Sequence, residues 1–172
     1  PRSRRRSDAL GPLLRSARKS AGPWGLEMNE HGVDGLPFPP ELHYLVEHQV
    51  WARFGGDGTA LVGITALGIR LAGEIYMCRV KAPGSVVTQG GSIAVVELAK
   101  SIVSVKSPVG GAVLEANPRL AGEPELVHLD PYGEGWLARL AVSDAQADQA
   151  ALLHGDAVVA AMARHAWLSR VE

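Results

Sequence analysis

Cysteine is nearly absent from this chain, because Cys78 is the only one among 172 residues. An intrachain disulfide and a cysteine-rich metal site are therefore excluded. A reducing compartment such as the cytoplasm is expected. Cys78 lies within the alternating stretch 74–80, which is typical of a buried strand cysteine rather than a nucleophile. No apolar run reaches the length needed to cross a bilayer, so no membrane partner is expected.

Basic residues are scarce beyond the first nineteen positions. Residues 1–19 hold seven Arg or Lys and one acid, whereas residues 20–172 hold ten basic and seventeen acidic residues. Nucleic-acid binding by this acidic body is not expected, because phosphate contacts need Lys and Arg. The Arg-rich opening resembles an organelle transit peptide, but a start at Met28 is the plainer interpretation, and no apolar core of a secretory signal follows. Residues 1–39, rich in Gly, Pro, Arg and Ser, are predicted to be a flexible extension.

The motifs of several enzyme classes are missing too. The chain has no phosphate-binding Gly-x-x-x-x-Gly-Lys loop and no Gly-x-Ser-x-Gly elbow. Its six histidines are scattered, and the odd spacing of His43 and His48 directs them to opposite faces of a strand. No nucleophile, base and orienting group stand in register. We therefore predict a non-catalytic protein without a metal site.

Short strands separated by Gly and Pro turns dominate what is present. Residues 44–54 and 59–64 are rich in β-branched and aromatic residues and flank the turn-forming run 55–58, which predicts a hairpin. Further strands are predicted over residues 74–80, 86–87, 92–97, 102–105, 112–115 and 136–141. Many short strands of this kind are typical of a small sandwich or a partly closed barrel.

Three helices are also predicted. Thr65 can cap a short helix that ends near Gly73. A capping box at residues 143–146 opens a helix over residues 145–153. Asp156 then begins a last helix that continues to about residue 167.

Lys100 is the residue whose position suggests a function. It lies between two predicted strands, at the tip of a hairpin. A weak internal echo flanks this hairpin, because the Val-Lys-x-Pro pattern of residues 80–83 recurs at 105–108 and suggests two similar half-sheets. An exposed amine on a rigid scaffold suits covalent loading with a prosthetic arm, and the cofactor then supplies the chemistry. Glu97, three residues earlier, is an acid that could mark the lysine for a modifying enzyme.

Three motifs, in this order, resemble the H protein family of the glycine cleavage system. They are Val95-Val96-Glu97-Leu98-Ala99-Lys100, Ser107-Pro108-Val109-Gly110-Gly111 and Asp130-Pro131-Tyr132-Gly133-Glu134-Gly135-Trp136. The resemblance covers roughly residues 42–168. It implies a mainly β, barrel-sandwich hybrid domain over residues 40–142, with C-terminal helices over 143–172 packed on it. It also implies lipoate covalently bound to Lys100.

The chain departs from the family pattern near the arm. The family's early His-Glu-Trp is His48-Gln49-Val50-Trp51 here, and an acid common four residues after the lysine is Ser104. In the family these acids face an arm that carries a cationic aminomethyl group, and burying an ammonium without a carboxylate is costly. The departures favour an H-like paralogue, the lipoate-binding protein of heterodisulfide-reductase-like sulfur oxidation. Biotin carriers place Met beside their lysine, so Ala99 and Ser101 disfavour biotin.

Three interpretations stay open. The favoured one is a lipoyl carrier whose arm on Lys100 shuttles a bound intermediate between enzymes, with sulfur preferred over the glycine-derived aminomethyl group as cargo. The second is an unmodified interaction module, and the third is an enzyme. The expected partners are a lipoate ligase or lipoyl transferase, and either a sulfur-oxidation complex or the glycine cleavage P, T and L proteins. We expect a cytoplasmic monomer.

Overall fold

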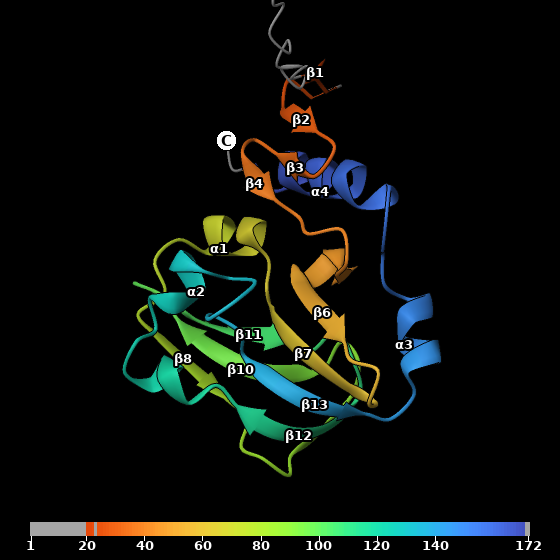
Figure 1. Ribbon diagram of the computed structural model, residues 1–172. Coiled ribbons are helices and arrows are strands. Elements are labelled where there is room, and N and C mark those ends of the chain that lie inside the picture. Colours follow the sequence, from red (N-terminus) through yellow and green to blue (C-terminus); the bar gives the residue numbers. More distant parts are fainter. Residues whose placement is uncertain (1–19, 23, 171–172) are drawn as a thin grey trace, which may run out of the picture.

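Two antiparallel sheets form the body of the protein. The structure is a computed structural model that describes residues 20–22 and 24–170. The larger sheet has the strand order β5-β6-β7-β13-β12-β9 and the smaller one β11-β10-β8 (Figure 1). The larger sheet consists of β5 (His43–Leu45), β6 (Val50–Phe54), β7 (Thr59–Ile64), β9 (Val86–Val87), β12 (Gly111–Ala116) and β13 (Ala138–Val142). The smaller sheet consists of β8 (Met77–Val80), β10 (Ser92–Glu97) and β11 (Ile102–Lys106).

The main hydrophobic core lies between these sheets. Val62 and Leu140 of the larger sheet and Ile93 of the smaller sheet are fully buried in it. Successive strand residues point to opposite faces, so one face of each sheet supplies this core. Cys78 of β8 belongs to the same core, and burial raises the pKa of its thiol to about 11. The predicted mainly β fold and the buried strand cysteine are both confirmed.

The predicted hairpin of residues 44–54 and 59–64 is interrupted in its first strand. A 3-10 helix, η1 (Val46–His48), separates β5 from β6, and Gln49 then adopts a left-handed backbone with φ of 54°. Non-glycine residues rarely adopt this conformation. A local pattern of apolar residues does not reveal the break, because contacts of Gln49 with distant elements stabilise it.

In the described part of the chain, four α-helices and a second 3-10 helix surround the sheets. They are α1 (Ala66–Ala72), η2 (Pro118–Ala121), α2 (Leu126–Leu129), α3 (Ala145–Ala150) and α4 (Ala157–Leu168). Thr65 caps α1 by accepting a hydrogen bond from the Gly68 N–H at 3.0 Å, and Gly73 ends the helix at φ of 78°, as predicted. Within the described ranges, no helix is both long enough and apolar enough to cross a bilayer.

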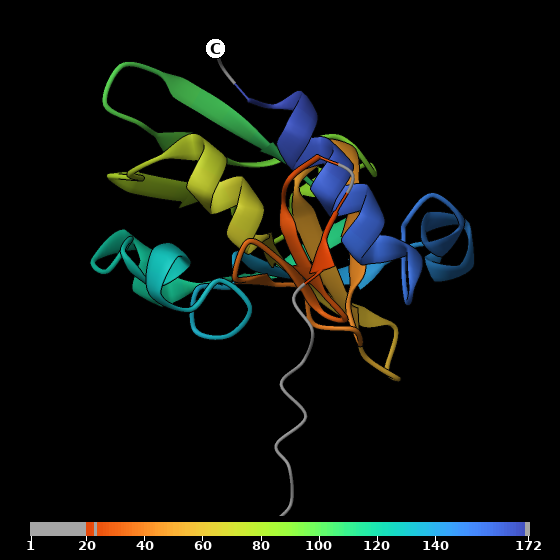
Figure 2. The same ribbon diagram turned by 90° about the horizontal axis from the view of Figure 1, so that it is seen from above.

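A four-stranded sheet that the sequence did not predict lies at the N-terminal end of the described chain. It has the order β1-β2-β3-β4 and consists of β1 (Ser20–Ala21), β2 (Glu27–Asn29), β3 (Gly32–Val33) and β4 (Leu36–Pro37). Leu26, Val33 and Phe38 are buried with Met162 of α4, and the views show α4 (blue) beside this sheet (orange) (Figures 1 and 2).

The predicted flexible extension over residues 1–39 is therefore wrong for residues 24–39, whereas residues 1–19 lie outside the described residues. The apolar residues of this segment are too few and too irregularly spaced to predict strands. They become a core only because a helix from the far end of the chain covers them.

The sequence echo flanks the central strand of the smaller sheet. Val80 of the first copy and Val105 of the second copy both pair with Ala94 of β10, from opposite sides. The two copies thus lie on β8 and β11, on either side of β10 in one three-stranded sheet, and not in the two half-sheets that the echo suggested. Since β10 has a paired strand on each edge, the hairpin that it forms with β11 has a firm base.

Candidate functional site

Lys100 lies at the tip of the β10–β11 hairpin, as predicted. The Leu98 N–H donates a hydrogen bond to the Ser101 carbonyl at 2.8 Å, which closes the turn around the lysine. Lys100 and Ala99 are exposed. Within the part of the chain that the structure describes, Lys100 has no hydrogen-bond or ion-pair partner. Figure 2 shows the hairpin (green) projecting from the body. The amine is therefore free for an enzyme to modify.

Glu97 is the last residue of β10. It pairs with Ile102 of β11 and Met77 of β8, and its carbonyl accepts a hydrogen bond from the Tyr76 N–H at 2.9 Å. Its side chain is half-buried at the base of the turn. Glu97 thus stands in the ordered part of the hairpin, and its recognition by a lipoylating enzyme stays a prediction.

A groove of about 290 Å³ runs beside β11. Six elements, some of them distant in sequence, contribute residues to its walls: η1, β7, α1, β10, β11 and α4. It is lined by Glu47, His48, Gln49, Ile64, Gly68, Leu71, Ala72, Ile75, Val96, Val103, Ser104, Val105 and His165. Most of these side chains are apolar, and Glu47 is the single carboxylate among them. Sequence reasoning missed this groove, because no local pattern brings η1 and α4 next to the lysine hairpin.

Gln49 holds the walls of this groove together. Its amide nitrogen donates to the Val46 carbonyl at 2.8 Å and to Met162 Sδ at 3.2 Å, while its amide oxygen accepts from the Thr65 hydroxyl at 2.6 Å. Its side chain is buried. The sequence comparison treated Gln49 as a lost carboxylate that faces the arm. The structure corrects this, because the amide is engaged within the protein and the exposed Glu47, two residues earlier, lies on the groove.

Ser104 lies on the β11 wall of the groove. Its hydroxyl donates to the Ser92 hydroxyl at 2.8 Å and lies 3.4 Å from the Lys106 amine, which donates to it. The position is exposed and lacks a carboxylate, as the sequence indicates. Glu47 is therefore the acidic group that the groove offers to a cation.

The run Asp130–Trp136 holds the start of α1, one of the elements that line the groove. The Tyr132 hydroxyl donates to the Pro37 carbonyl at 2.7 Å and accepts from the Ala66 N–H at 3.0 Å, so it ties β4 to the start of α1. Burial raises the pKa of Tyr132, which keeps the phenol protonated for this role. The Trp51 indole N–H lies within hydrogen-bond distance of the Pro131 carbonyl, at 3.1 Å. The motif that is most specific for the family resemblance is thus structural.

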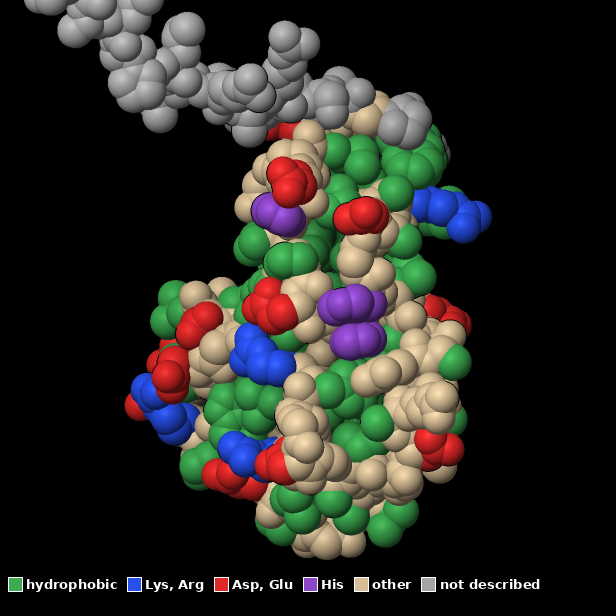
Figure 3. All heavy atoms as spheres, turned by 45° about the vertical axis from the view of Figure 1, so that its right-hand side comes forward, with side chains coloured by type: hydrophobic (Ala, Val, Ile, Leu, Met, Phe, Trp, Pro, Cys, Tyr) green, Lys and Arg blue, Asp and Glu red, His purple; other side chains and the backbone are tan. Residues whose placement is uncertain are grey.

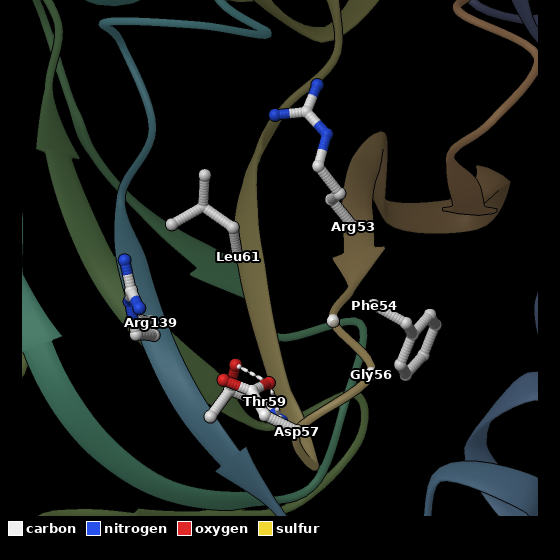
Figure 4. A pocket seen from close by; sticks show the side chains of 8 residues that line it. Arg53, Phe54, Gly56, Asp57, Thr59, Leu61 and Arg139 are labelled. Carbon is white, nitrogen blue, oxygen red and sulfur yellow. Dashed lines mark hydrogen bonds between the residues drawn. The ribbon is translucent and has the colours of Figure 1, made fainter.

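A second hollow, of about 560 Å³, lies at the β6–β7 turn and does not include the lysine hairpin. Arg53 and Arg139 flank Leu61 on neighbouring strands of the larger sheet, and Asp57 accepts a hydrogen bond from the Thr59 hydroxyl at 2.6 Å (Figure 4). Arg53 already donates to the Tyr132 carbonyl at 3.3 Å. None of the site residues predicted from the sequence lies here.

No metal centre accompanies either hollow in the described ranges. Over residues 20–22 and 24–170, no three His, Cys, Asp or Glu side chains gather closely enough to hold a metal ion. The arrangement at the hairpin instead suits a covalently attached organic group, because it combines a free amine on a rigid turn with an apolar groove beside it.

This combination of fold and displayed lysine defines a carrier domain of the lipoyl and biotinyl type. The model of the glycine cleavage H-protein family matches residues 42–165, and the chain belongs to this family. Its members carry lipoate covalently bound to a lysine and are carriers rather than catalysts.

Individual relatives agree with the family model. Glycine cleavage system H protein 2 of Aquifex aeolicus is 38% identical over 125 residues, which cover 73% of this chain and 78% of that protein. The glycine cleavage system H protein of Mycobacterium avium is 42% identical over 114 residues, covering 66% and 86% of the two chains.

A solved structure extends this agreement to the fold. The crystal structure of a glycine cleavage system H protein from Mycobacterium marinum is 28% identical, with a TM-score of 0.57 over 62% of this chain and 87% of that one. The predicted barrel-sandwich hybrid is confirmed. For the cargo, these similarities favour the glycine cleavage alternative over the sulfur-oxidation paralogue that the sequence departures favoured.

Proposed function

We propose that this chain is a glycine cleavage system H protein that carries the aminomethyl group of glycine on a lipoyl arm attached to Lys100. The observation that supports the cargo is the groove beside β11, which is mainly apolar and holds one carboxylate, Glu47. When bound, the lipoyl group supplies a dithiol at the end of a long flexible arm.

The residues of this chain then have separate roles. Lys100 provides the attachment amine, and the apolar side chains of Leu71 and Val103 shield an arm that lies in the groove from water. Glu47 provides a negative charge for a cationic amine, which would be costly to hold there without a counter-charge. His165 forms part of the α4 wall, and burial lowers the pKa of its imidazole, so it adds no positive charge near pH 7.

The partners follow from the same proposal. A lipoate ligase or lipoyl transferase would modify Lys100, and the P, T and L proteins would load, unload and reoxidise the arm. Ile102 and Val103, which are 68% and 43% exposed beside the lysine, give such enzymes an apolar contact on the hairpin. The cytoplasm stays the predicted compartment.

The attachment is tested by intact mass spectrometry after co-expression with a lipoate ligase. The wild-type protein should gain one lipoyl mass increment, and Lys100→Arg should abolish it. Lys81→Arg is the matched control, because Lys81 is also exposed and belongs to the other copy of the echo, so its increment should persist. An increment that survives in Lys100→Arg would overturn the assignment.

The cargo is tested by reconstituting the lipoylated protein with glycine cleavage P, T and L proteins. We expect glycine-dependent turnover with the wild type and a fall on the order of tenfold with Glu47→Gln, the size of effect that one lost charge contact of about 1.4 kcal/mol gives. Glu30→Gln, an exposed acid away from the groove, should leave turnover unchanged. A lipoylated wild type that supports no turnover would refute the aminomethyl cargo and leave the attachment site intact.

A further inference from the structure

Two histidines from distant parts of the chain stack on the surface of the molecule. His43 lies on β5 and His154 lies in the connector between α3 and α4. Their ring centroids are 4.1 Å apart and their planes differ by 12°. Figure 3 shows two histidine side chains in contact on one face of the molecule. The edge-on ring of Phe54 completes the cluster, 5.0 Å from His43.

The stack lies where the connector is fastened to β5. Tyr44 and Leu153 exchange both backbone hydrogen bonds, at 2.8 and 2.9 Å. The Nδ1 atom of His154 lies 2.8 Å from the Leu42 carbonyl, and since a carbonyl only accepts, this nitrogen carries the proton. The connector is thus joined to β5 by a short isolated bridge and by one imidazole.

Protonation of His43 is unfavourable. No atom among the described residues hydrogen-bonds the buried Nδ1 atom of His43, so a proton there would have no acceptor. Burial, and then the charge of His154, lower the pKa of His43. Charged groups also lie on the segments that adjoin the stack. Glu41 and Arg53 are within 4.0 Å of each other, and the connector carries Asp156, two residues beyond His154.

We propose that the His43–His154 stack is a pH-operated clasp. With His43 neutral, the connector stays on β5. When the pH falls and His43 takes up a proton, a buried charge lies against the stacked His154 ring, and the Tyr44–Leu153 bridge opens.

The connector links the His43–His154 stack to the groove beside β11. The connector leads directly into α4, whose Met162 accepts a hydrogen bond from Gln49 and whose His165 lines the groove. Opening of the bridge frees the N-terminal end of α4 from β5. The position of one groove wall therefore depends on the protonation of His43, which lies outside the groove.

Hydrogen exchange of the full, unlipoylated chain tests the clasp without reference to any cargo. The measured quantity is the protection of the Tyr44 and Leu153 amides at pH 7 and pH 5, corrected for intrinsic exchange. We expect their protection to fall severalfold more than that of the β12–β13 ladder, because opening at the connector is local and leaves this ladder closed. His43→Phe keeps an aromatic ring and cannot protonate, so it should remove most of this fall.

His31→Gln is the control, because His31 is exposed and lies outside the stack, and it should behave as the wild type. The clasp is refuted if the wild-type amides keep their protection at pH 5, or if His43→Phe loses protection as steeply as the wild type. If His43→Phe does not fold, His154→Phe replaces it, with the His43 imidazole titration followed by NMR. The pKa of His43 should rise in His154→Phe, because the charge of His154 lowers it in the wild type. An unchanged His43 titration would contradict the proposal.

Discussion

Gln49 is a single residue that joins three elements. Its amide contacts the Val46 carbonyl of η1, the Thr65 hydroxyl that caps α1 and the thioether of Met162 on α4. Gly68 packs against it so closely that an added Cβ would lie 2.9 Å from the Cβ of Gln49. The left-handed backbone at this position places the amide among these groups, and hydrogen bonds of this kind make up for the unfavourable backbone conformation.

Gln49→Leu should therefore lower the free energy of unfolding by roughly 1–3 kcal/mol, because buried polar groups of Val46 and Thr65 lose a partner. The exposed Gln146 on α3 provides the control, and Gln146→Leu should change stability little. Urea denaturation measures both variants. Equal midpoints for the two would contradict the structural role of Gln49.

The same residue marks a limit of prediction from sequence. A motif comparison correctly found that a carboxylate is missing at Gln49, yet it could not tell that this amide is buried. It also overlooked Glu47, whose importance depends on a groove that six separate elements form. Lys100 was predictable because the turn and both of its strands are local in sequence.

At the scale of elements, α4 is the piece on which the N-terminal sheet depends. Val158, Met162 and Ala163 of this helix share a core with Val33 and Phe38. The N-terminal sheet packs its apolar side chains against α4. Short strands of this kind are marginal without a partner that buries their apolar side chains.

Truncation of the chain after Gly155 should therefore expose residues 24–38 to proteolysis, while the β10–β11 hairpin keeps its hydrogen-exchange protection. The matched control is truncation after Ser169, which leaves α4 complete. Limited proteolysis with mass spectrometry locates the cleavage sites. A truncated protein that resists cleavage in residues 24–38 would show that the sheet is stable without the helix.

The helices and strands that could be predicted from the sequence are those whose patterns are local. Strands β7, β10 and β11 and helix α1 have local patterns with Gly turns or a Thr cap, and all were predicted close to their observed bounds. The N-terminal sheet and η1 were not predicted, because each is stabilised by side chains that lie far away in the sequence. The predicted helix over residues 145–153 ends three residues early, and the residues beyond it form the connector that bonds to β5.

At the scale of the whole molecule, two hydrophobic cores share β5 and β6. The first core lies between the larger sheet and the sheet β11-β10-β8. The second core joins Trp51 and Tyr44 to the N-terminal sheet and α4. Two half-buried histidines, His43 and His165, lie on the elements of the second core. Burial lowers the pKa of both.

Stability should for this reason fall as the pH drops below 6.5. The unfolded chain takes up protons on these two residues near their ordinary pKa of 6.5, whereas the folded chain takes them up only at lower pH, so acid favours the unfolded state. Their contribution is complete above pH 6.5 and is lost progressively below it. Urea midpoints at pH 7 and pH 5.5 measure this, and the double variant His43→Phe/His165→Phe should show a smaller difference. An equal pH dependence of the two proteins would contradict the assignment.

The central position of β10 has a mechanical consequence. Ala94 is paired on both sides, so the strand that leads to Lys100 cannot shift along or away from its neighbours without breaking two ladders. An arm attached at the turn would swing from a fixed pivot, and the volume that it can sweep would be set by its own length and by the groove wall. Partner enzymes that exchange cargo with such an arm need only approach one fixed corner of the body, and each can do so without reshaping it.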